Sequence, residues 1–307
     1  MINNKKHEVQ TLIDQANDQP DIKPRRMSFP FKRMKANLYF DDNSLKSSFI
    51  AALSATFPPG EAEFIASVRN YRDQIKDPKL QEQIRGFIGQ EGHHSHQHKQ
   101  VNETLSNLGW DAARLEHSFQ RELDKRIHKF SNRFRLAMTV GMEHLTAILA
   151  EHILENPEKL APMEPEARHL LYWHAVEEIE HKAVAFDVFM TCDGDQKYLR
   201  KILKIGRILF VLRISAYMIA MHWWARKFPG WREIKGFGSF LWGKDGVITS
   251  LKQPFRDYFK PGFHPWDHAN QHLIDKWKND FYHPEFDKGS EQYIKPDDGP
   301  AVQASPV

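Results

Sequence analysis

The chain has a single cysteine, Cys192, among its 307 residues. One thiol excludes a disulfide bond within the chain, a cysteine-ligated iron–sulfur cluster and a cysteine-rich zinc site. An excess of one charge is also missing, because 43 lysine and arginine residues stand against 40 aspartate and glutamate residues, for a net charge of +3. That balance gives no indication of nucleic-acid binding. We expect a protein of a reducing compartment, the cytoplasm, that does not bind nucleic acid.

Neither a secretory signal nor a strand pattern is evident. The first residues, from Met1 to His7, are polar and contain no apolar segment. Across residues 31–195 the hydrophobic residues do not alternate with a period of two, as they would in a half-buried strand. They recur every three or four residues, which is the spacing of one helix face. The sequence therefore predicts an all-α fold.

Prolines and polar stretches divide the chain into four predicted parts. These are a flexible N-terminal arm (1–30), a helical bundle (31–195), a C-terminal helical extension (196–284) and a disordered tail (285–307). The bundle is predicted to contain helices over 43–56, 60–76, 78–109, 110–126, 130–155 and 166–191. The prolines of Phe57-Pro-Pro-Gly60 are expected to separate the first two of these helices. The extension is predicted to contain an apolar helix (197–228), a loop (229–265) and a short helix (266–280).

Histidine is abundant, with 17 residues, and two histidines belong to a repeated motif. Glu91 and His94 form one Glu-x-x-His sequence, and Glu178 and His181 form another. Each pair lies on the apolar stripe of a predicted helix, where a carboxylate and an imidazole are costly unless they are paired or bind a metal. Two such motifs, together with one glutamate from each of two other helices, define the dinuclear carboxylate bundles.

The two additional carboxylates are predicted to be Glu61 and Glu143. Each lies on the apolar stripe of the helix that precedes a Glu-x-x-His motif, at a distance that fits an antiparallel neighbour. Alternatively, Glu61 complements a helix dipole in a first turn, and Glu143 is a partly buried partner of a basic residue. Glu63 and Glu151 are then the substitute ligands.

The combined pattern resembles the ferritin-like di-iron carboxylate superfamily. More closely, three segments resemble a bacterial family known as predicted metal-dependent hydrolases. These segments are Phe57-Pro-Pro-Gly-Glu61, Gln90-Glu-x-x-His94 and Trp173-His-x-x-Glu-Glu-x-Glu-His181, and the likeness extends over residues 25–280. The resemblance implies a ferritin-like four-helix bundle with extra helices and polar tails, and a site for two metal ions.

Three further residues lie close to the motifs. His174 precedes Glu178 by one helical turn, in a spacing similar to the third-histidine pattern of di-iron arylamine N-oxygenases, which implies a seventh ligand. The alternative for His174, and for His98 on the other helix, is a buried imidazole that is hydrogen-bonded to a neighbour. Glu177 resembles the acid that orients a ligating histidine in related bundles. We take Glu177 and His174 as candidate catalytic residues, and predict as metal ligands Glu61, Glu91, His94, Glu143, His174, Glu178 and His181.

Carboxylate and imidazole ligands suit iron or manganese, and the lack of thiolates disfavours a structural zinc site. We expect two metal ions, with iron favoured and manganese or zinc as alternatives. The first hypothesis is an oxidoreductase or oxygenase that uses O2 to oxidise a small, apolar organic substrate. The second is a metal-dependent hydrolase in which a metal-bridging water is the nucleophile, as the family name suggests. The third is a metal-binding protein without enzymatic activity.

The predicted apolar helix 197–228 bears on partners and location. Its segment Ile208–Trp224 contains one charged residue, Arg213, and basic residues flank it on both sides. A membrane span needs about 20 apolar residues and disfavours a central arginine. We expect this helix to pack on the bundle or on a second copy of the chain in a homodimer, with peripheral membrane contact as the alternative.

Overall fold

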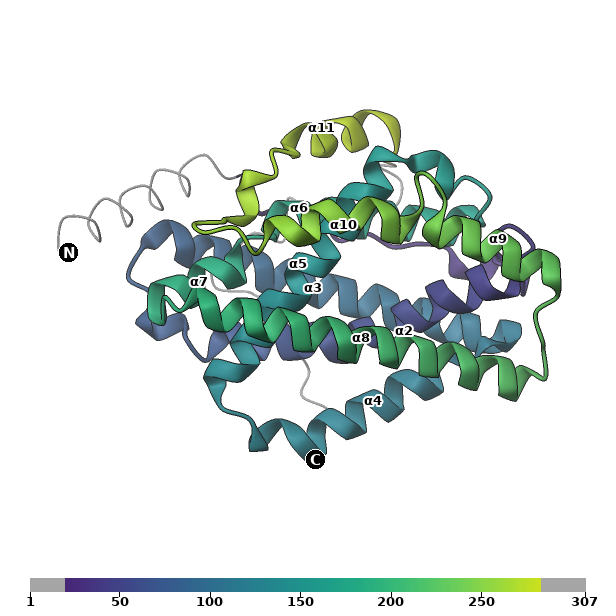
Figure 1. The fold of residues 1–307 in the computed structure, drawn as a ribbon, viewed down its shortest axis with the longest axis horizontal. Helices are drawn as coiled ribbons and strands as arrows, with labels where there is room; N and C mark the ends of the chain where they lie inside the picture. Colours follow the sequence, from purple (N-terminus) through teal and green to yellow (C-terminus); the bar gives the residue numbers. More distant parts are fainter. Residues whose placement is uncertain (1–19, 283–307) are drawn as a thin grey trace.

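Four long helices form the core of the molecule in a computed structural model that describes residues 20–282 (Figure 1). They are α2 (Ser44–Arg69), α3 (Pro78–Leu105), α5 (Asn132–Glu155) and α6 (Pro165–His181). Helix α2 packs on α3 and α5, and α6 packs on the same two helices, so that a four-membered bundle closes. No strand occurs within residues 20–282, and the predicted all-α fold is confirmed. Residues 1–19 and 283–307 lie outside the described residues, and with them most of the predicted arm and tail.

Local signals set the helix starts. The side chain of Asn43 accepts hydrogen bonds from the first backbone amides of α2, and Ser131 does the same for α5. Asp77 caps α3, and Pro78 occupies the first helical position, where its missing amide hydrogen leaves no bond unmade. These caps fix where each ligand-bearing helix begins and therefore the height of its glutamates in the bundle.

Helix α2 is continuous, so the predicted break at Pro58 and Pro59 is wrong. Proline removes the amide that would bond the carbonyl four residues earlier, which for Pro58 is the carbonyl of Ser54. The Asn102 side chain of α3 donates a hydrogen bond to that carbonyl instead (3.1 Å). A neighbouring helix thus replaces the bond that proline removes, and α2 runs through.

Two other predicted elements differ from the structure. The predicted helix 166–191 is divided into α6 and α7 (Val184–Cys192) by a turn at Lys182. The predicted loop 229–265 contains two helices, α9 (Trp231–Trp242) and α10 (Val247–Asp257), whose glycines and exposed aromatics obscure the helical period. In α9, Phe240 turns inward while Trp231 and Trp242 turn outward.

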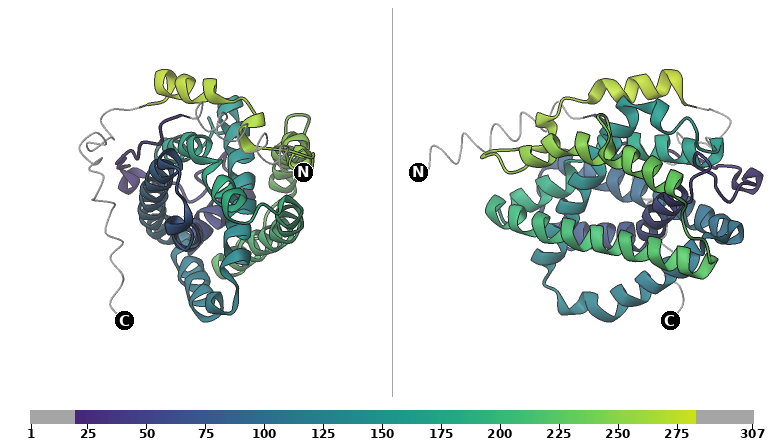
Figure 2. Two further views of the ribbon diagram at one scale, coloured as in Figure 1. Left: turned by 90° about the vertical axis from the view of Figure 1, so that its left-hand side faces the viewer. Right: turned by 45° about the vertical axis from the view of Figure 1, so that its right-hand side comes forward.

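The remaining helices cover the bundle from different sides. Helix α4 (Ala112–Arg126) packs on α2 and α3, α8 (Gln196–Ala225) packs mainly on α5, and α11 (Gln271–Asp280) packs on α6. Seen from one end, α4 and α11 lie on opposite sides of the bundle and α8 lies on a third (Figure 2). No helix within residues 20–282 is long and apolar enough to cross a membrane.

Residues 20–34, which we call the N-terminal strap, pack against the bundle, and they include the last part of the predicted flexible arm (1–30). Met27, Phe29 and Phe31 are each at most 5 % exposed. Two glycines of α3 make room for the strap, since a Cβ atom on Gly86 or Gly89 would overlap the backbone of Ile22 or the ring of Pro24. The strap thereby reaches the motif-bearing end of α6.

Candidate metal centre

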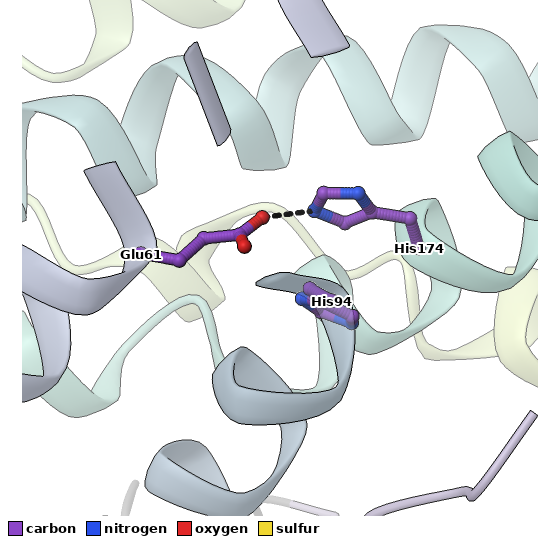
Figure 3. A group of neighbouring side chains, drawn as sticks. All are labelled: Glu61, His94 and His174. Carbon is purple, nitrogen blue, oxygen red and sulfur yellow. Dashed lines mark ion pairs between the residues drawn. The ribbon is translucent and has the colours of Figure 1, made fainter. Parts of the chain in front are cut away.

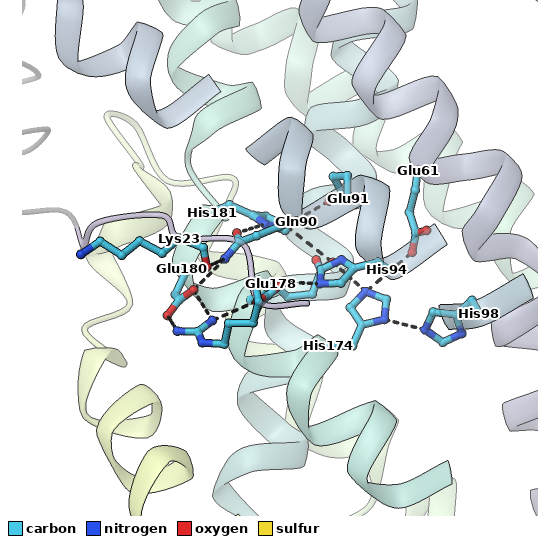
Figure 4. A network of polar contacts seen from close by, with 12 residues as sticks. Lys23, Glu61, Gln90, Glu91, His94, His98, His174, Glu178, Glu180 and His181 are labelled. Carbon is cyan, nitrogen blue, oxygen red and sulfur yellow. Dashed lines mark hydrogen bonds and ion pairs between the residues drawn. The ribbon is translucent and has the colours of Figure 1, made fainter. Parts of the chain in front are cut away.

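The four bundle helices direct all seven predicted ligands into one buried region, and Figure 4 labels all of them except Glu143. None of the seven is more than 4 % exposed. Helix α2 contributes Glu61, α3 contributes Glu91 and His94, α5 contributes Glu143, and α6 contributes His174, Glu178 and His181. Glu61 is in the interior of continuous α2, so the first-turn alternative for this residue is wrong.

The ligand atoms form two groups. In one, atoms of Glu61, His94 and His174 all lie within 4.8 Å of one another (Figure 3). In the other, atoms of Glu91, Glu178 and His181 also lie within 4.8 Å of one another. Glu178 Oε1 is close to both groups, at 2.9 Å from His174 Nε2, 3.8 Å from His94 Nδ1 and 3.6 Å from His181 Nε2. This carboxylate therefore lies between two potential metal positions.

Glu143 faces the second group from α5. Its Oε2 atom lies 3.5 Å from His181 Nε2, and Glu91 Oε1 lies 3.1 Å from the same nitrogen. Neither contact has the alignment of a hydrogen bond. The substitute ligands are elsewhere: Glu63 forms a two-fold ion pair with Arg135 (2.6 and 2.8 Å), and Glu151 lies 3.9 Å from His268.

Buried polar atoms without hydrogen bonds test whether metal ions fit here. Within residues 20–282, these include both carboxylate oxygens of Glu61, Glu91 and Glu143, Oε2 of Glu178, Nδ1 of His94 and Nε2 of His181. Most buried polar groups in proteins have partners, because an unpaired one costs free energy. Oxygen and nitrogen lone pairs that converge without partners are the donor set of a divalent metal site. The residues present therefore fit two metal ions.

The electrostatics of the cluster also favour added cations. Burial raises the pKa of Glu61 and Glu143 well above the usual value, and repulsion from neighbouring carboxylates adds to this effect. Although burial opposes it, the hydrogen bond from His174 and the nearby positive charge of His181 lower the pKa of Glu178. Burial lowers the pKa of His181, but the surrounding carboxylates outweigh burial and raise it. Burial lowers the pKa of His94 and keeps it neutral. Without cations the carboxyl groups of Glu61, Glu91 and Glu143 resist ionisation, and two divalent ions would neutralise the four charges of these residues and Glu178.

Glu177 orients His94. Its Oε2 accepts a hydrogen bond from His94 Nε2 (3.0 Å), which turns Nδ1 of that ring toward the ligand cluster. Its Oε1 accepts hydrogen bonds from the backbone amide and from Nη1 of Arg25, both at 3.1 Å. Arg25 belongs to the N-terminal strap. The strap therefore holds Glu177 in place, and Glu177 orients His94.

A second chain of contacts orients His181. Gln90 Nε2 donates to Glu180 Oε2 (2.7 Å), so Gln90 Oε1 accepts from His181 Nδ1 (2.9 Å). When His181 is neutral, its lone pair is then on Nε2, which faces Glu91 and Glu143. Arg25 also holds Glu180, through a hydrogen bond from Nη1 (2.8 Å) and another from Nη2. One arginine thus supports two of the histidines that are predicted as ligands.

A third chain fixes His174 (Figure 4). Asn102 Nδ2 donates to Glu116 Oε2 (2.8 Å), so Asn102 Oδ1 accepts from the Ser54 hydroxyl (2.6 Å). The Ser54 oxygen then accepts from His98 Nδ1 (2.8 Å), and His98 Nε2 accepts from His174 Nδ1 (2.7 Å). This order leaves the lone pair of His174 on Nε2, which faces the cluster. His174 Nε2 lies 2.9 Å from Glu178 Oε1, and the two atoms share a proton at the position where a metal ion would bind.

Sequence reasoning missed most of these supporting residues. The sequence shows Gln90 only as part of a motif, and it places Arg25 in the predicted flexible arm. His98 was considered, but its link to Ser54 connects helices whose register the sequence does not specify. A buried Ser or Asn on a motif-bearing helix is the one signal that could have indicated them, because such residues need partners.

Comparison with known proteins gives one match. The model of a family described as predicted metal-dependent hydrolase matches residues 23–269. No curated protein and no solved structure matches the chain. The family match supports metal dependence and overturns the expected preference for an oxidoreductase or oxygenase over a hydrolase. Carboxylate–imidazole ligands are compatible with both chemistries, which is why the ligand set alone led to the wrong preference.

Proposed function

The chain belongs to the predicted metal-dependent hydrolase family, and we propose from this that it hydrolyses a small organic substrate at a dinuclear metal site. The proposed ligands are Glu61, Glu91, His94, Glu143, His174, Glu178 and His181. The observation that carries the proposal is the convergence, in one buried place, of carboxylate oxygens and imidazole nitrogens without hydrogen-bond partners. Iron, manganese and zinc all suit such a donor set.

Some residues would bind the metal ions, and others hold those ligating side chains in position. Bound metal ions supply Lewis acidity, which polarises a carbonyl and makes water a nucleophile near neutral pH. Glu178 lies between the two ligand groups and is suited to join two ions. Glu177 touches His94 and acts through it, so we assign Glu177 a positioning role. His174 presents Nε2 as a ligand, and the chain through His98 holds that orientation.

Metal content tests the ligand assignment. We expect two metal ions per chain in the purified protein by elemental analysis, and none in the double variant Glu91→Gln with Glu178→Gln. The matched control is Glu63→Gln with Glu151→Gln, which makes the same charge change at two acids outside the cluster. Unchanged metal content in the first double variant would sink the assignment, as would equal loss in the control.

Hydrolysis is tested with metal-free protein that is reloaded separately with Fe(II), Mn(II) or Zn(II). Chromogenic carboxylic and phosphoric esters are offered to each form under nitrogen, so that O2 cannot contribute. We expect ester cleavage that requires a metal and disappears in the double variant but not in its control. Protein that binds two ions and cleaves none of these esters would favour a metal-binding protein without enzymatic activity.

A further inference from the structure

A cavity of about 60 Å³ adjoins the ligand cluster. Its wall is mainly apolar and comes from α2, α5, α6 and α9, with Phe49, Leu53, Phe57, Leu149 and Phe240 among the lining residues. His174 and Glu178 also line it, and both belong to the proposed metal site. The cavity is therefore an apolar chamber that reaches the proposed metal site.

We propose that this cavity holds the acyl chain of the substrate, and that the chain is short and unbranched; this rests on the proposed hydrolase function. A ligand pocket lined by apolar side chains accepts the apolar part of a ligand, and its few polar groups fix the reactive part. Here those polar groups include the proposed ligands, so the carbonyl group of the substrate lies beside them. An apolar cavity of roughly 150 Å³ accommodates benzene. This one is less than half as large, which suits a short alkyl chain and excludes an aromatic ring.

The reaction balances as ester hydrolysis. The oxygen of water forms a bond to the acyl carbon, and the bond from that carbon to the alcohol oxygen breaks. The alcohol takes one proton, and a short carboxylic acid and an alcohol leave. No oxidant or further reactant is consumed.

Variants that change the cavity size test the assignment. Leu53→Ala enlarges the cavity, and Ala150→Leu, on the α5 wall, fills it. The wild type should cleave p-nitrophenyl butyrate with a kcat/KM at least tenfold above that for p-nitrophenyl benzoate. Leu53→Ala should reduce this preference severalfold, and Ala150→Leu should lower butyrate cleavage tenfold relative to acetate. Leu136→Ala, a buried truncation on α5 away from the cavity, is the control and should keep the wild-type ratios. Ratios that do not change in either cavity variant overturn the proposal.

A binding measurement separates this proposal from the hydrolase function. Ligand-observed NMR with 1-butanol reports occupancy of the cavity without any reaction. Binding to the wild type and loss in Ala150→Leu support the cavity assignment even if no ester is cleaved. Equal binding to both forms overturns the cavity assignment even if esters are cleaved.

A different surface carries a second, independent inference. Large apolar side chains that are more than a third exposed are concentrated between Ile205 and Ile248, and within residues 20–282 only Phe130 lies outside that range. On α8 the most exposed of them recur along one face: Leu212, Ile219 and Trp223 are 61 %, 70 % and 72 % exposed. Trp231 of α9 is 77 % exposed. The turn after α8 joins these two helices, and both lie on one side of the bundle (Figure 2). We call residues 196–260 the α8–α10 face.

The same stretch is strongly basic. Residues 196–260 contain 14 lysine and arginine residues and three aspartate and glutamate residues. The rest of the chain has more acidic than basic residues, since the overall totals are 43 and 40. Two copies of such a face repel each other, which disfavours a homodimer through it. Arg213 leaves the apolar stripe, because its guanidinium bonds Glu122 (3.1 Å) and stacks on Phe119 of α4 (3.9 Å).

We infer that the α8–α10 face docks on an anionic lipid surface. Exposed tryptophans beside basic residues are typical of segments that lie in the headgroup region. Lysine and arginine residues near a membrane attract anionic lipids. The described helices are too short or too polar to span a bilayer, so the contact is peripheral.

Vesicle sedimentation tests this docking. The full chain should sediment with vesicles of equal parts phosphatidylcholine and phosphatidylserine, and at least tenfold less with phosphatidylcholine alone. Trp223→Ser with Trp231→Ser should reduce binding at least tenfold, while Phe130→Ser, an exposed aromatic outside the face, should not. Lys197→Glu with Lys201→Glu should also reduce binding at least tenfold, and Lys125→Glu with Lys129→Glu, two exposed lysines outside residues 196–260, is the charge control.

Three outcomes overturn the proposal. One is equal binding to both kinds of vesicle, and another is binding to neither. The third is a dimer in sedimentation equilibrium that dissociates in Trp223→Ser with Trp231→Ser, which would make the face a subunit interface.

Discussion

Each imidazole that we propose as a metal ligand has one nitrogen fixed by a partner outside the cluster. Glu177 holds His94, Gln90 holds His181, and His98 holds His174. Because the second nitrogen then has only one direction to face, the rings are oriented before any ion binds. Such outer partners commonly change metal affinity by about 10–100-fold when they are removed.

Arg25 should be the supporting residue with the largest effect on stability. Its side chain is 12 % exposed and pairs with Glu177 and Glu180, which are buried. Arg25→Gln leaves two carboxylates without a counter-charge, and breaking a buried pair in this way costs about 3–5 kcal/mol. Urea unfolding should show that loss, and elemental analysis should show less bound metal. Arg133→Gln is the control, since Arg133 makes a similar two-fold pair with Asp193 at the surface. Equal stability losses in the two variants would contradict the prediction.

Lys182 should make the stability depend on pH. It is 3 % exposed, and burial lowers its pKa from 10.5 to about 7. Between these two values the unfolded chain binds more protons than the folded protein, so the free energy of unfolding rises with pH. Urea unfolding at pH 7, 8 and 9 should show a rise of about 1 kcal/mol per pH unit from this group. Lys182→Met should remove that rise, and Lys125→Met, at an exposed position, should keep it.

At the scale of elements, the sequence predicts helices that have a strong amphipathic period, but it predicts the positions of their ends less well. The period of α3 and α5 is clear, and both motifs were placed on the correct helices. Helix α2 was wrongly divided because its continuity depends on Asn102 of another helix. Helices α9 and α10 were missed because Gly236, Gly238 and Pro254 weaken the local preference, which packing overrides.

The fit between α3 and the strap depends on the absence of two side chains. In Gly86→Ala with Gly89→Ala, each new Cβ overlaps the strap, so the strap should detach. Trypsin should then cleave at Arg25 or Arg26 much faster than in the wild type, as followed by mass spectrometry. Gly238→Ala is the control, because no atom lies within 4 Å of its Cβ position. That helical substitution should stabilise the protein by about 0.5–1 kcal/mol. Unchanged cleavage in the α3 variant would contradict the prediction.

For the whole molecule, the candidate site was more predictable than its support. The predicted ligand set follows from spacings of three and four within single helices and from one glutamate on each preceding helix. Arg25 lies 152 and 155 residues from its two partners, and no local period connects them. Contacts of that kind come from tertiary packing, which a single sequence does not reveal.

The buried carboxylates that would bind metal should lower the stability of the metal-free protein. Buried carboxylates without cations are costly, so metal-free Glu91→Gln with Glu178→Gln should unfold at a higher urea concentration than the metal-free wild type. With metal at 100 times its Kd, the wild type should gain about 2.7 kcal/mol for each ion that it binds, and the variant should gain nothing. The order of stabilities should therefore reverse on addition of metal. The same order with and without metal would contradict the prediction.

The position of the strap has a consequence for biosynthesis. Arg25 leaves the ribosome early, but its partner Glu180 is added 155 residues later. At about 5–20 residues per second, that interval lasts roughly 8–30 s. During translation only the α3 part of the strap's site is available, and the predicted ligands of α2 and α3 are synthesised before those of α5 and α6. The strap therefore completes its contacts late, and until α6 is made Glu177 and Glu180 cannot be paired with Arg25.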